Sequence, residues 1–207
     1  MQVSCWPEGE LAYVTIGKTA TTSVLYTLAL SAGMEILPNK SPHCYDWHVL
    51  SLEHARSLGL YVFTTVRNPY NRLLSLWAQV ASPGYEPKHH VLDADGKSVL
   101  YDGMPFYQFA YEALRIPPQS ADPHYRPQYL LTDNFNGIDQ LLRVETLARD
   151  WAQLQRKAKQ PLRDIEWHNR SQHGSCWQYY TPYLMSMVQE YYAQDFAMLG
   201  YSTELPP

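Results

Sequence analysis

Two apolar runs in the first third of the chain each lead toward a helical pattern. The run over residues 11–16 (LAYVTI) predicts a short buried strand. After a polar turn, apolar residues recur at helical spacing from Val24 to Ala32, and Gly33 ends this predicted helix. The run over residues 60–66 (LYVFTTV) is rich in β-branched and aromatic residues and predicts a second buried strand. The chain therefore begins as strand, turn and helix, with another buried strand after it.

A second helix is predicted directly after residue 66. Asn68 can cap it, and Pro69 takes its first position, where a missing N–H costs nothing. Its apolar stripe consists of Leu73, Leu76, Trp77 and Val80. The second strand thus also leads straight into a helix.

The second half of the chain gives weaker signals of the same kind. A helix is predicted over 104–114 and a third strand over 139–144. Thr146 is expected to cap the next helix, and Thr181-Pro182 opens a last helix that ends near Gly200. Strands that alternate with helices predict an α/β fold with a central, mostly parallel sheet flanked by helices in three layers.

Two stretches between these elements have no clear period. Residues 82–105 hold several glycines and prolines and two adjacent histidines, and residues 117–127 are rich in proline. A loop as long as 82–105 is uncommon in a compact domain unless it has a function. Residues 82–128 are therefore treated as an insertion within one domain that spans residues 1–207.

Composition and charge narrow the setting. Of the 207 residues, 45% are hydrophobic and 17% are charged, which is enough apolar material for a buried core. No run of about 18 apolar residues exists and the N-terminus lacks a signal-peptide pattern, so a cytoplasmic protein without a membrane partner is expected. The net charge of −4 gives no reason to expect nucleic acid. The three cysteines are widely spaced, and no metal-ligand cluster is predicted.

The turn between the first strand and helix has the chemistry of an anion site. Backbone N–H groups at a helix N-terminus are unpaired, and they bind phosphate with the help of the helix dipole. Lys18 adds a positive charge, and the hydroxyls of Thr19, Thr22 and Ser23 are expected to add donors. The predicted anion-binding residues are Gly17, Lys18, Thr19, Ala20, Thr21, Thr22 and Ser23.

Two other interpretations of this turn stay open. The letters GKT suggest a Walker A loop, but that motif needs a glycine five residues before Gly17, where this chain has Ala12. An ordinary nucleoside triphosphatase or kinase is therefore disfavoured. The turn can also be a capped helix with a surface lysine.

A second candidate anion site follows the second strand. Arg67 leaves the carboxyl end of that strand, the place where open α/β sheets bind ligands, and can contact a phosphate with two N–H groups. Ser75 lies two turns into the next helix, and Arg72 shares that helix face. The alternative is that Arg67 pairs with a carboxylate and Ser75 only packs.

Together, Lys18–Ser23 (KTATTS) and Arg67–Ser75 (RNPYNRLLS) resemble the two nucleotide-binding segments of the PAPS-dependent sulfotransferases, particularly the Golgi-type carbohydrate branch. Gly17 departs from the proline that this family usually has there. Residues 143–150 and 179–201 resemble later segments of the same family. The resemblance implies a P-loop-like fold and transfer of a sulfuryl group from 3′-phosphoadenosine 5′-phosphosulfate (PAPS) to a hydroxyl, with adenosine 3′,5′-bisphosphate (PAP) as product and no metal.

The resemblance also implies catalytic roles. Lys18 would stabilise the leaving phosphate, and His48 would be the general base, since 45–52 resembles the segment that carries the proposed base of uronosyl 2-O-sulfotransferases. His124 competes for the base role, because it lies in a stretch that resembles an H-W-x-P-Q segment near the acceptor. Asn169 and Arg170 resemble a loop that closes over the nucleotide.

Rival functions remain at this point. A phosphoryl-transfer enzyme with a degenerate P-loop would need Mg²⁺ and a later acidic residue, for which the sequence offers no convincing aspartate. A non-catalytic nucleotide- or glycan-binding domain would keep the scaffold alone. For a transferase, the acceptor is expected to be a carbohydrate or small molecule, with residues 82–128 shaping its pocket.

Overall fold

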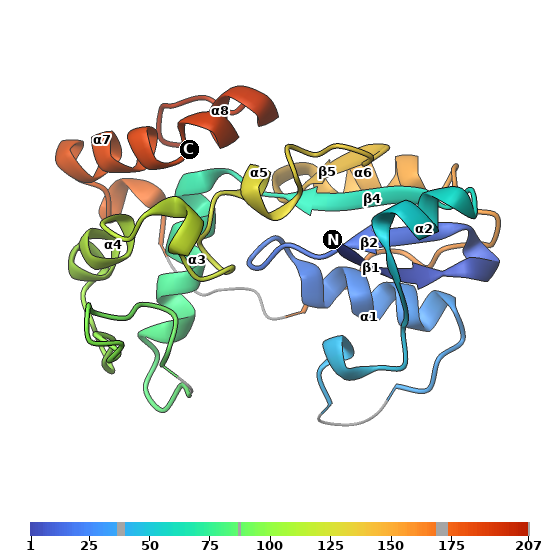
Figure 1. Ribbon diagram of the computed structural model, residues 1–207, viewed down its shortest axis with the longest axis horizontal. Helices are drawn as coiled ribbons and strands as arrows, with labels where there is room; N and C mark the ends of the chain where they lie inside the picture. The colour runs from blue at the N-terminus through green and yellow to red at the C-terminus, as the bar shows by residue number, and fades with distance from the viewer. Residues whose placement is uncertain (37–39, 87, 169–173, 207) are drawn as a thin grey trace. The chain divides into compact units, whose positions relative to one another are not determined.

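The computed structural model describes residues 1–36, 40–86, 88–168 and 174–206 (Figure 1). The chain divides into two compact units. Met1–Val66 and Phe135–Arg170 form the first, which contains every strand of the sheet and is named the sheet unit. Arg67–Asn134 and Ser171–Pro207 form the second, named the helical unit. The expectation of one domain over residues 1–207 stays a prediction.

The sheet has five strands in the order β3-β1-β2-β4-β5. Their bounds are β1 Gln2–Trp6, β2 Leu11–Val14, β3 His48–Ser51, β4 Tyr61–Val66 and β5 Gln140–Arg143. β4 pairs in parallel with β2 and β5, whereas β1 pairs antiparallel with β2 and β3. The three predicted strands are confirmed as the parallel part of the sheet, and β1 and β3 extend it with antiparallel pairs that the sequence did not predict.

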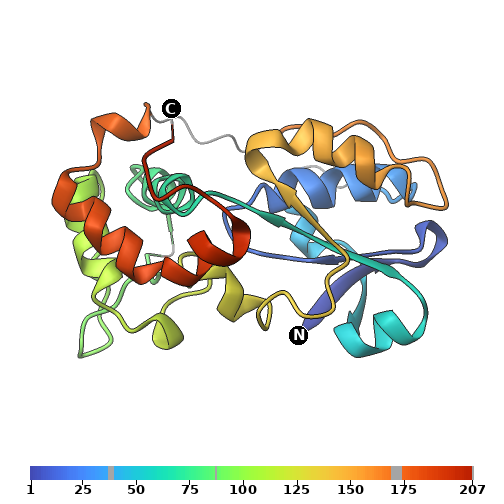
Figure 2. The ribbon, with the colours of Figure 1, turned by 90° about the horizontal axis from the view of Figure 1, so that it is seen from above.

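Helices cover both faces of this sheet (Figure 2). The helices of the sheet unit are α1 Thr21–Ser31, α2 Leu52–Ser57 and α6 Leu147–Leu154. Tyr13 and Phe63 pack on the face with α1 and α6, whereas Ala12 and Val62 pack on the face with α2. Strands buried on both faces read as continuous apolar runs, which is why β2 and β4 were visible in the sequence. The α/β fold with helices on both sides of a central sheet is thereby confirmed.

The cap predicted for α6 is wrong in its chemistry. Thr146 does stand at the N-cap position, but its side chain makes no capping hydrogen bond. Its hydroxyl donates instead to Asp150 Oδ2 at 2.8 Å, and the backbone N–H of Arg143 donates to the same oxygen at 2.9 Å. The buried carboxylate of Asp150 therefore ties the end of β5 to the start of α6.

The helical unit packs its helices around a single core. Their bounds are α3 Pro69–Val80, α4 Phe106–Leu114, α5 Gln128–Leu131, α7 Pro182–Tyr191 and α8 Ala193–Leu199. Asn68 Oδ1 accepts from the Tyr70 N–H at 3.0 Å, so the predicted cap of α3 is confirmed. The single last helix was wrong in one respect, because Tyr192 leaves helical geometry and divides it into α7 and α8.

The two aperiodic stretches contribute to this core. In 82–105 the described residues form one isolated bridge, Leu92 with Ser98, and several side chains are buried: His90, Val91, Leu100 and Met104. A single 3₁₀ turn, Pro118–Ser120, interrupts 117–127. Within the described residues, no helix is both long and apolar enough to cross a membrane.

Candidate functional site

The turn after β2 carries two strained residues. Lys18 and Ala20 have φ angles of 68° and 63°, in the left-handed region that residues with a Cβ rarely adopt. Each such residue costs about 1–3 kcal/mol and persists only where its surroundings dictate the conformation. Strained residues are concentrated at binding sites. The surrounding structure must therefore hold Lys18 and Ala20 in this conformation, and the conformation suggests a binding role.

The structural cause is a buried network of hydroxyl groups below the turn. Thr19 and Thr21 both donate their hydroxyls to the carbonyl of Ile16, at 2.7 and 2.6 Å. Thr65 Oγ1, on β4, lies 2.8 Å from Thr19 Oγ1 and 2.6 Å from the Tyr13 hydroxyl. Tyr13 donates in turn to Thr21 Oγ1 at 3.3 Å. Two neighbouring strands thus hold the turn from beneath.

Burial keeps the Tyr13 hydroxyl protonated. Desolvation raises the pKa of Tyr13 above its ordinary value, and hydrogen bonds with the threonines lower it by less. A protonated phenol can donate within the network, whereas a phenolate cannot. The upward shift therefore favours the form of Tyr13 that the network needs.

Above this network, α1 begins without a side-chain cap. Its N-cap is Ala20, which has no capping group, and its first turn holds no acidic residue. The first N–H groups of an α-helix have no partner within the helix, and they carry the positive end of its dipole. Lys18 stands two residues before the N-cap Ala20 and is half-buried. This arrangement can bind a phosphate or sulfate group.

Two of the three hydroxyls expected to face a ligand donate to carbonyl groups of the protein instead. Thr19 is fully buried and donates inward to Ile16, and Ser23 donates to the carbonyl of His168 at 3.3 Å. Ser23 Oγ also accepts from the His168 N–H at 2.9 Å. The expectation that these hydroxyls face a ligand is corrected. Their backbone N–H groups, with Gly17, Thr21 and half-buried Thr22, remain the predicted anion contacts.

The residue that precedes Asn169 and Arg170, of the loop predicted to close over the nucleotide, contacts this same helix. His168 is held by Ser23, and its ring lies 4.0 Å from the ring of Tyr26, measured between centroids. Asn169 and Arg170 lie outside the described residues. The chain therefore enters this predicted loop from a residue fixed at the first turn of α1.

His48 lies away from the Lys18 turn within the sheet unit. It is exposed at the start of the edge strand β3, and its register partner Cys5 pairs in turn with Ala12. Strands advance about 3.3 Å per residue and lie about 4.8 Å apart. The Cα of His48 is therefore about 13 Å from the level of Ile16 along the sheet and about 10 Å across it. This position gives no support to the predicted base role.

In the helical unit, the backbone of Arg67 is clamped by one side chain. Gln128 donates to the Arg67 carbonyl at 2.9 Å and accepts from the Arg67 N–H at 3.0 Å. Asp195 holds this residue in turn: its carboxylate accepts from the backbone N–H groups of Gln128 and Tyr129 at 2.8 and 2.9 Å, and from the Gln128 side-chain amide at 3.3 Å. Burial raises the pKa of Asp195, and the backbone hydrogen bonds oppose that shift. The sequence pattern gave Gln128 no role.

The helix after Arg67, α3, carries two polar residues that the sequence placed near a phosphate, Ser75 and Arg72. Ser75 is buried on α3. Arg72 is also buried, and its guanidinium donates to the carbonyls of Arg126 at 2.7 Å and Pro123 at 3.0 Å. Arg72 lies on the helix face that was expected to meet an anion, but its guanidinium binds carbonyls of the 122–126 segment.

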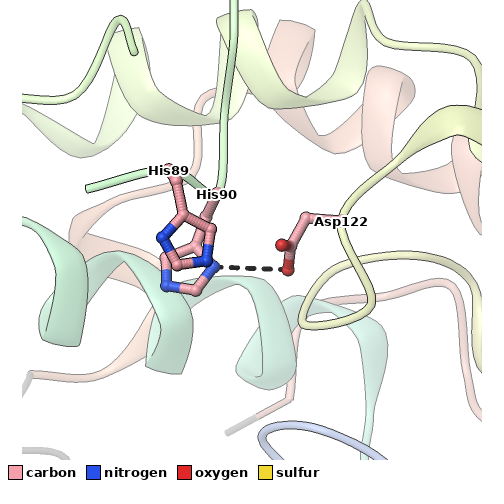
Figure 3. A group of neighbouring side chains, drawn as sticks. All are labelled: His89, His90 and Asp122. Carbon is pink, nitrogen blue, oxygen red and sulfur yellow. Dashed lines mark ion pairs between the residues drawn. The ribbon is translucent and has the colours of Figure 1, made fainter. Parts of the chain in front are cut away.

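That segment presents a histidine with a carboxylate partner. His124 Nδ1 lies 2.7 Å from Asp122 Oδ1, and the His124 N–H donates to the same oxygen at 2.8 Å. His89 and His90 also lie beside Asp122, and His90 Nδ1 is 3.3 Å from the same Oδ1 (Figure 3). Burial raises the pKa of Asp122, but hydrogen bonds from His124 and the nearby His90 ring outweigh this effect and hold that pKa well below its usual range.

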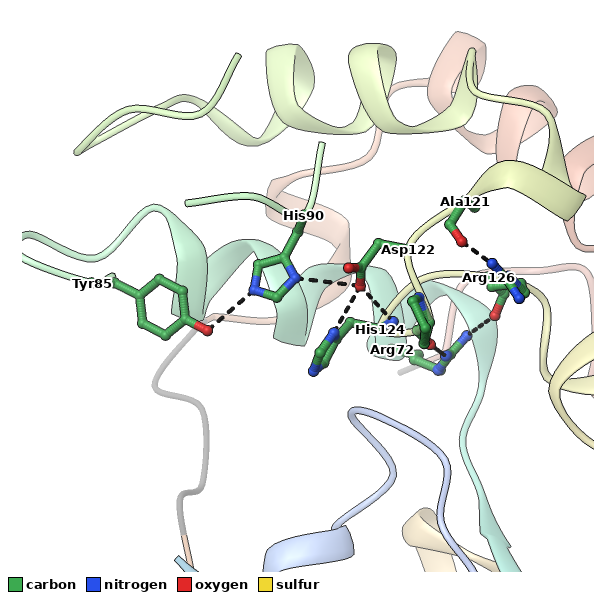
Figure 4. Close-up of polar contacts among 8 residues, drawn as sticks. Arg72, Tyr85, His90, Ala121, Asp122, His124 and Arg126 are labelled. Carbon is green, nitrogen blue, oxygen red and sulfur yellow. Dashed lines mark hydrogen bonds and ion pairs between the residues drawn. The ribbon is translucent and has the colours of Figure 1, made fainter. Parts of the chain in front are cut away.

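Figure 4 shows that His90 and His124 both approach the Asp122 carboxylate, and their ring centroids lie 4.6 Å apart. The His124 side chain is 43% exposed, although one edge of its ring is tied to the carboxylate. An imidazole oriented by a carboxylate on one nitrogen and open to solvent on the other is the arrangement of a general base. His124 thus has the local geometry that His48 lacks.

The fold is α/β, and its first strand–turn–helix unit has the features expected of an anion site. A model described as the Sulfotransferase family matches residues 4–202 of the chain. The chain therefore belongs to the sulfotransferase family, whose reaction moves a sulfuryl group to a hydroxyl-bearing acceptor. Neither the curated proteins nor the solved structures contain a significant match.

The hydroxyl network predicts a loss of stability on mutation. Thr65→Val keeps the shape of the side chain but removes a partner of the Tyr13 and Thr19 hydroxyls, so the free energy of unfolding should fall by about 1–3 kcal/mol. Urea denaturation measures this change. Thr15→Val, at an exposed position of the same turn, is the matched control and should change stability by less than about 0.5 kcal/mol. Equal unfolding midpoints for both variants would show that the network does not stabilise the turn.

Proposed function

We propose that this protein transfers the sulfuryl group of PAPS to an acceptor hydroxyl, with the Lys18 turn holding the 5′-phosphosulfate. The observation that carries the proposal is the uncapped start of α1, with Lys18 and Ala20 held in left-handed geometry above a buried network. Strain maintained at an uncapped helix N-terminus favours an anion as its ligand. Membership in the sulfotransferase family supports PAPS as that ligand.

The proposed reaction is an in-line displacement at sulfur. The acceptor oxygen forms a new S–O bond while the bond from sulfur to the bridging phosphosulfate oxygen breaks, and PAP leaves with the electron pair. Lys18 and the N–H groups of α1 would stabilise the charge that grows on the leaving phosphate. The proton of the acceptor hydroxyl passes to a general base.

We assign the 3′-phosphate of the nucleotide to Arg67 and Ser75. β2 and β4 pair in parallel with Val14 opposite Thr64, so the chain leaves both strands at the same end of the sheet. Arg67 is the first residue after β4, and the Gln128 clamp fixes its backbone. A guanidinium can form two hydrogen bonds to one phosphate. These features support a second anion contact that completes recognition of the nucleotide.

For the general base we propose His124, with Asp122 orienting the ring. His124 has a carboxylate 2.7 Å from Nδ1, whereas His48 forms no ion pair within the described parts of the chain. The register of β3 also places His48 far along the sheet from Ile16. His48 remains the second candidate.

For the acceptor we propose a carbohydrate. The stretch from Asp122 to Gln128 resembles a segment near the acceptor in carbohydrate sulfotransferases, and it carries the proposed base. The helical unit also has an open pocket of about 210 Å³ with Trp77 and Tyr179 in its lining. Aromatic faces in a pocket are suited to the C–H faces of a sugar ring.

Nucleotide binding tests the assignment of the two anion contacts. Lys18→Ala and Arg67→Ala should each weaken PAP binding at least about tenfold, because each removes a charge-assisted contact to a phosphate. Isothermal titration calorimetry measures the affinity. Lys40→Ala, which removes an exposed lysine of the sheet unit, should leave it unchanged. Wild-type protein that fails to bind PAP would refute the cofactor, and full affinity in both variants would refute the site.

Transfer from labelled PAPS to a panel of glycans and small alcohols tests the base. His124→Ala should lower turnover by about a hundredfold or more while PAP affinity stays near wild type, because only the proton acceptor is lost. His48→Ala should keep most of its turnover. The reverse pattern would move the base to His48, and ATP hydrolysis that requires Mg²⁺ would favour a phosphoryl-transfer enzyme instead.

A further inference from the structure

Three side chains of the helical unit converge from two loop segments. His89 and His90 lie in the 82–105 stretch, and Asp122 lies in the 117–127 stretch (Figure 3). One potential ligand atom from each residue lies within 4.8 Å of the corresponding atoms of the other two. His89 is exposed, His90 is buried and Asp122 is half-buried. The group is therefore reachable from solvent yet anchored in the core.

The ring of His90 is the informative member of this group. His90 is only 4% exposed, and its Nδ1 makes no hydrogen bond with any described residue. Asp122 Oδ1 lies 3.3 Å from Nδ1, at ion-pair distance but without the alignment of a hydrogen bond. A buried polar atom without a hydrogen bond costs about 1–3 kcal/mol. Asp122 is already hydrogen-bonded by His124, so it is the His90 nitrogen that lacks a hydrogen-bond partner among the described residues.

A metal ion accounts for this separation. Zinc binds imidazole nitrogen at about 2.0–2.1 Å and carboxylate oxygen at about 2.0–2.2 Å, and a tetrahedral angle then places the two ligand atoms about 3.3 Å apart. The distance between His90 Nδ1 and Asp122 Oδ1 is 3.3 Å. A nitrogen and an oxygen that share a metal do not need hydrogen-bond alignment with each other.

The surrounding contacts follow the pattern of an outer ligand shell. The opposite nitrogen of His90, Nε2, lies 3.2 Å from the Tyr85 hydroxyl, and His124 Nδ1 lies 2.7 Å from Asp122 Oδ1 (Figure 4). Metal-binding imidazoles commonly bond through their second nitrogen, and metal-binding carboxylates are themselves hydrogen-bonded. A carboxylate has about four lone-pair sites, so Asp122 can accept from His124 and still bind a metal.

We propose that His89, His90 and Asp122 bind a divalent transition-metal ion, with Zn²⁺ as the ion that suits them. Two imidazoles and one carboxylate match the ligands of zinc, whereas Mg²⁺ and Ca²⁺ are bound by oxygen. Three protein ligands leave a fourth position for water. The ion would join the 82–105 stretch to the segment that carries His124. The proposal does not depend on sulfuryl transfer.

Titration of metal-free full-length protein with Zn²⁺ tests the site. We expect binding of one ion per chain by calorimetry and a rise in melting temperature, because an ion that binds only the folded state stabilises it. Co²⁺ in place of Zn²⁺ should give the visible absorption of a nitrogen- and oxygen-ligated ion. His90→Ala and Asp122→Asn should weaken Zn²⁺ binding at least about tenfold, since each removes a ligand or its charge.

Control variants distinguish this site from other side chains of the protein that could bind a metal ion. His89→Ala changes an exposed side chain, so it should fold normally and still lose affinity for Zn²⁺. His54→Ala, an exposed histidine of α2, and Cys44→Ser, an exposed thiol, should both bind as wild type does. Absence of Zn²⁺ binding at micromolar concentrations, or binding that survives His89→Ala and His90→Ala, would overturn the proposal. PAP affinity measured on the same samples reports separately on the nucleotide site.

Discussion

The carbonyl of Ile16 is the point on which the architecture of the candidate nucleotide site depends. It accepts two buried threonine hydroxyls, and through Thr65 it is linked to the neighbouring strand. A buried network in which each polar group is satisfied is rigid, whereas one missing partner leaves an expensive unpaired group. This rigidity is what allows Lys18 and Ala20 to hold conformations that they would otherwise avoid. An uncapped helix can then present its N–H groups to a ligand at no further conformational cost.

In the helical unit, buried charged side chains and not hydroxyls fix the backbone around the candidate ligand-binding residues. Arg72 donates to two carbonyls of the segment that carries His124, and Asp195 accepts from both the backbone N–H and the side-chain amide of Gln128, the residue that clamps Arg67. Both side chains are buried, so each must be fully bonded to offset its lost hydration. The residues proposed to touch a ligand are thus placed by residues that do not.

Local patterns were predictable, and distant partnerships were not. The strand–turn–helix around Lys18 and the cap at Asn68 depend on residues close together in sequence, so spacing was enough to find them. β3 has mostly exposed positions and gave no apolar signal. The hydroxyl of Thr19 was assigned to a ligand because its partner Thr65 lies 46 residues away, on another strand. The Gln128 clamp and the three-residue group around His90 likewise appear only when separate segments fold together.

The clamp on Arg67 also affects the order in which the contacts of the candidate site can form during synthesis. Thr65 is 52 residues from Tyr13, so the contacts beneath the Lys18 turn become available early as the chain emerges. Gln128 is 61 residues beyond Arg67, and Asp195 is 67 residues beyond Gln128. The arginine proposed to bind the 3′-phosphate therefore gains its support only when the last helix has been made. In a ribosome-bound nascent chain, the network beneath the Lys18 turn can therefore form before the residues that support Arg67 have been made.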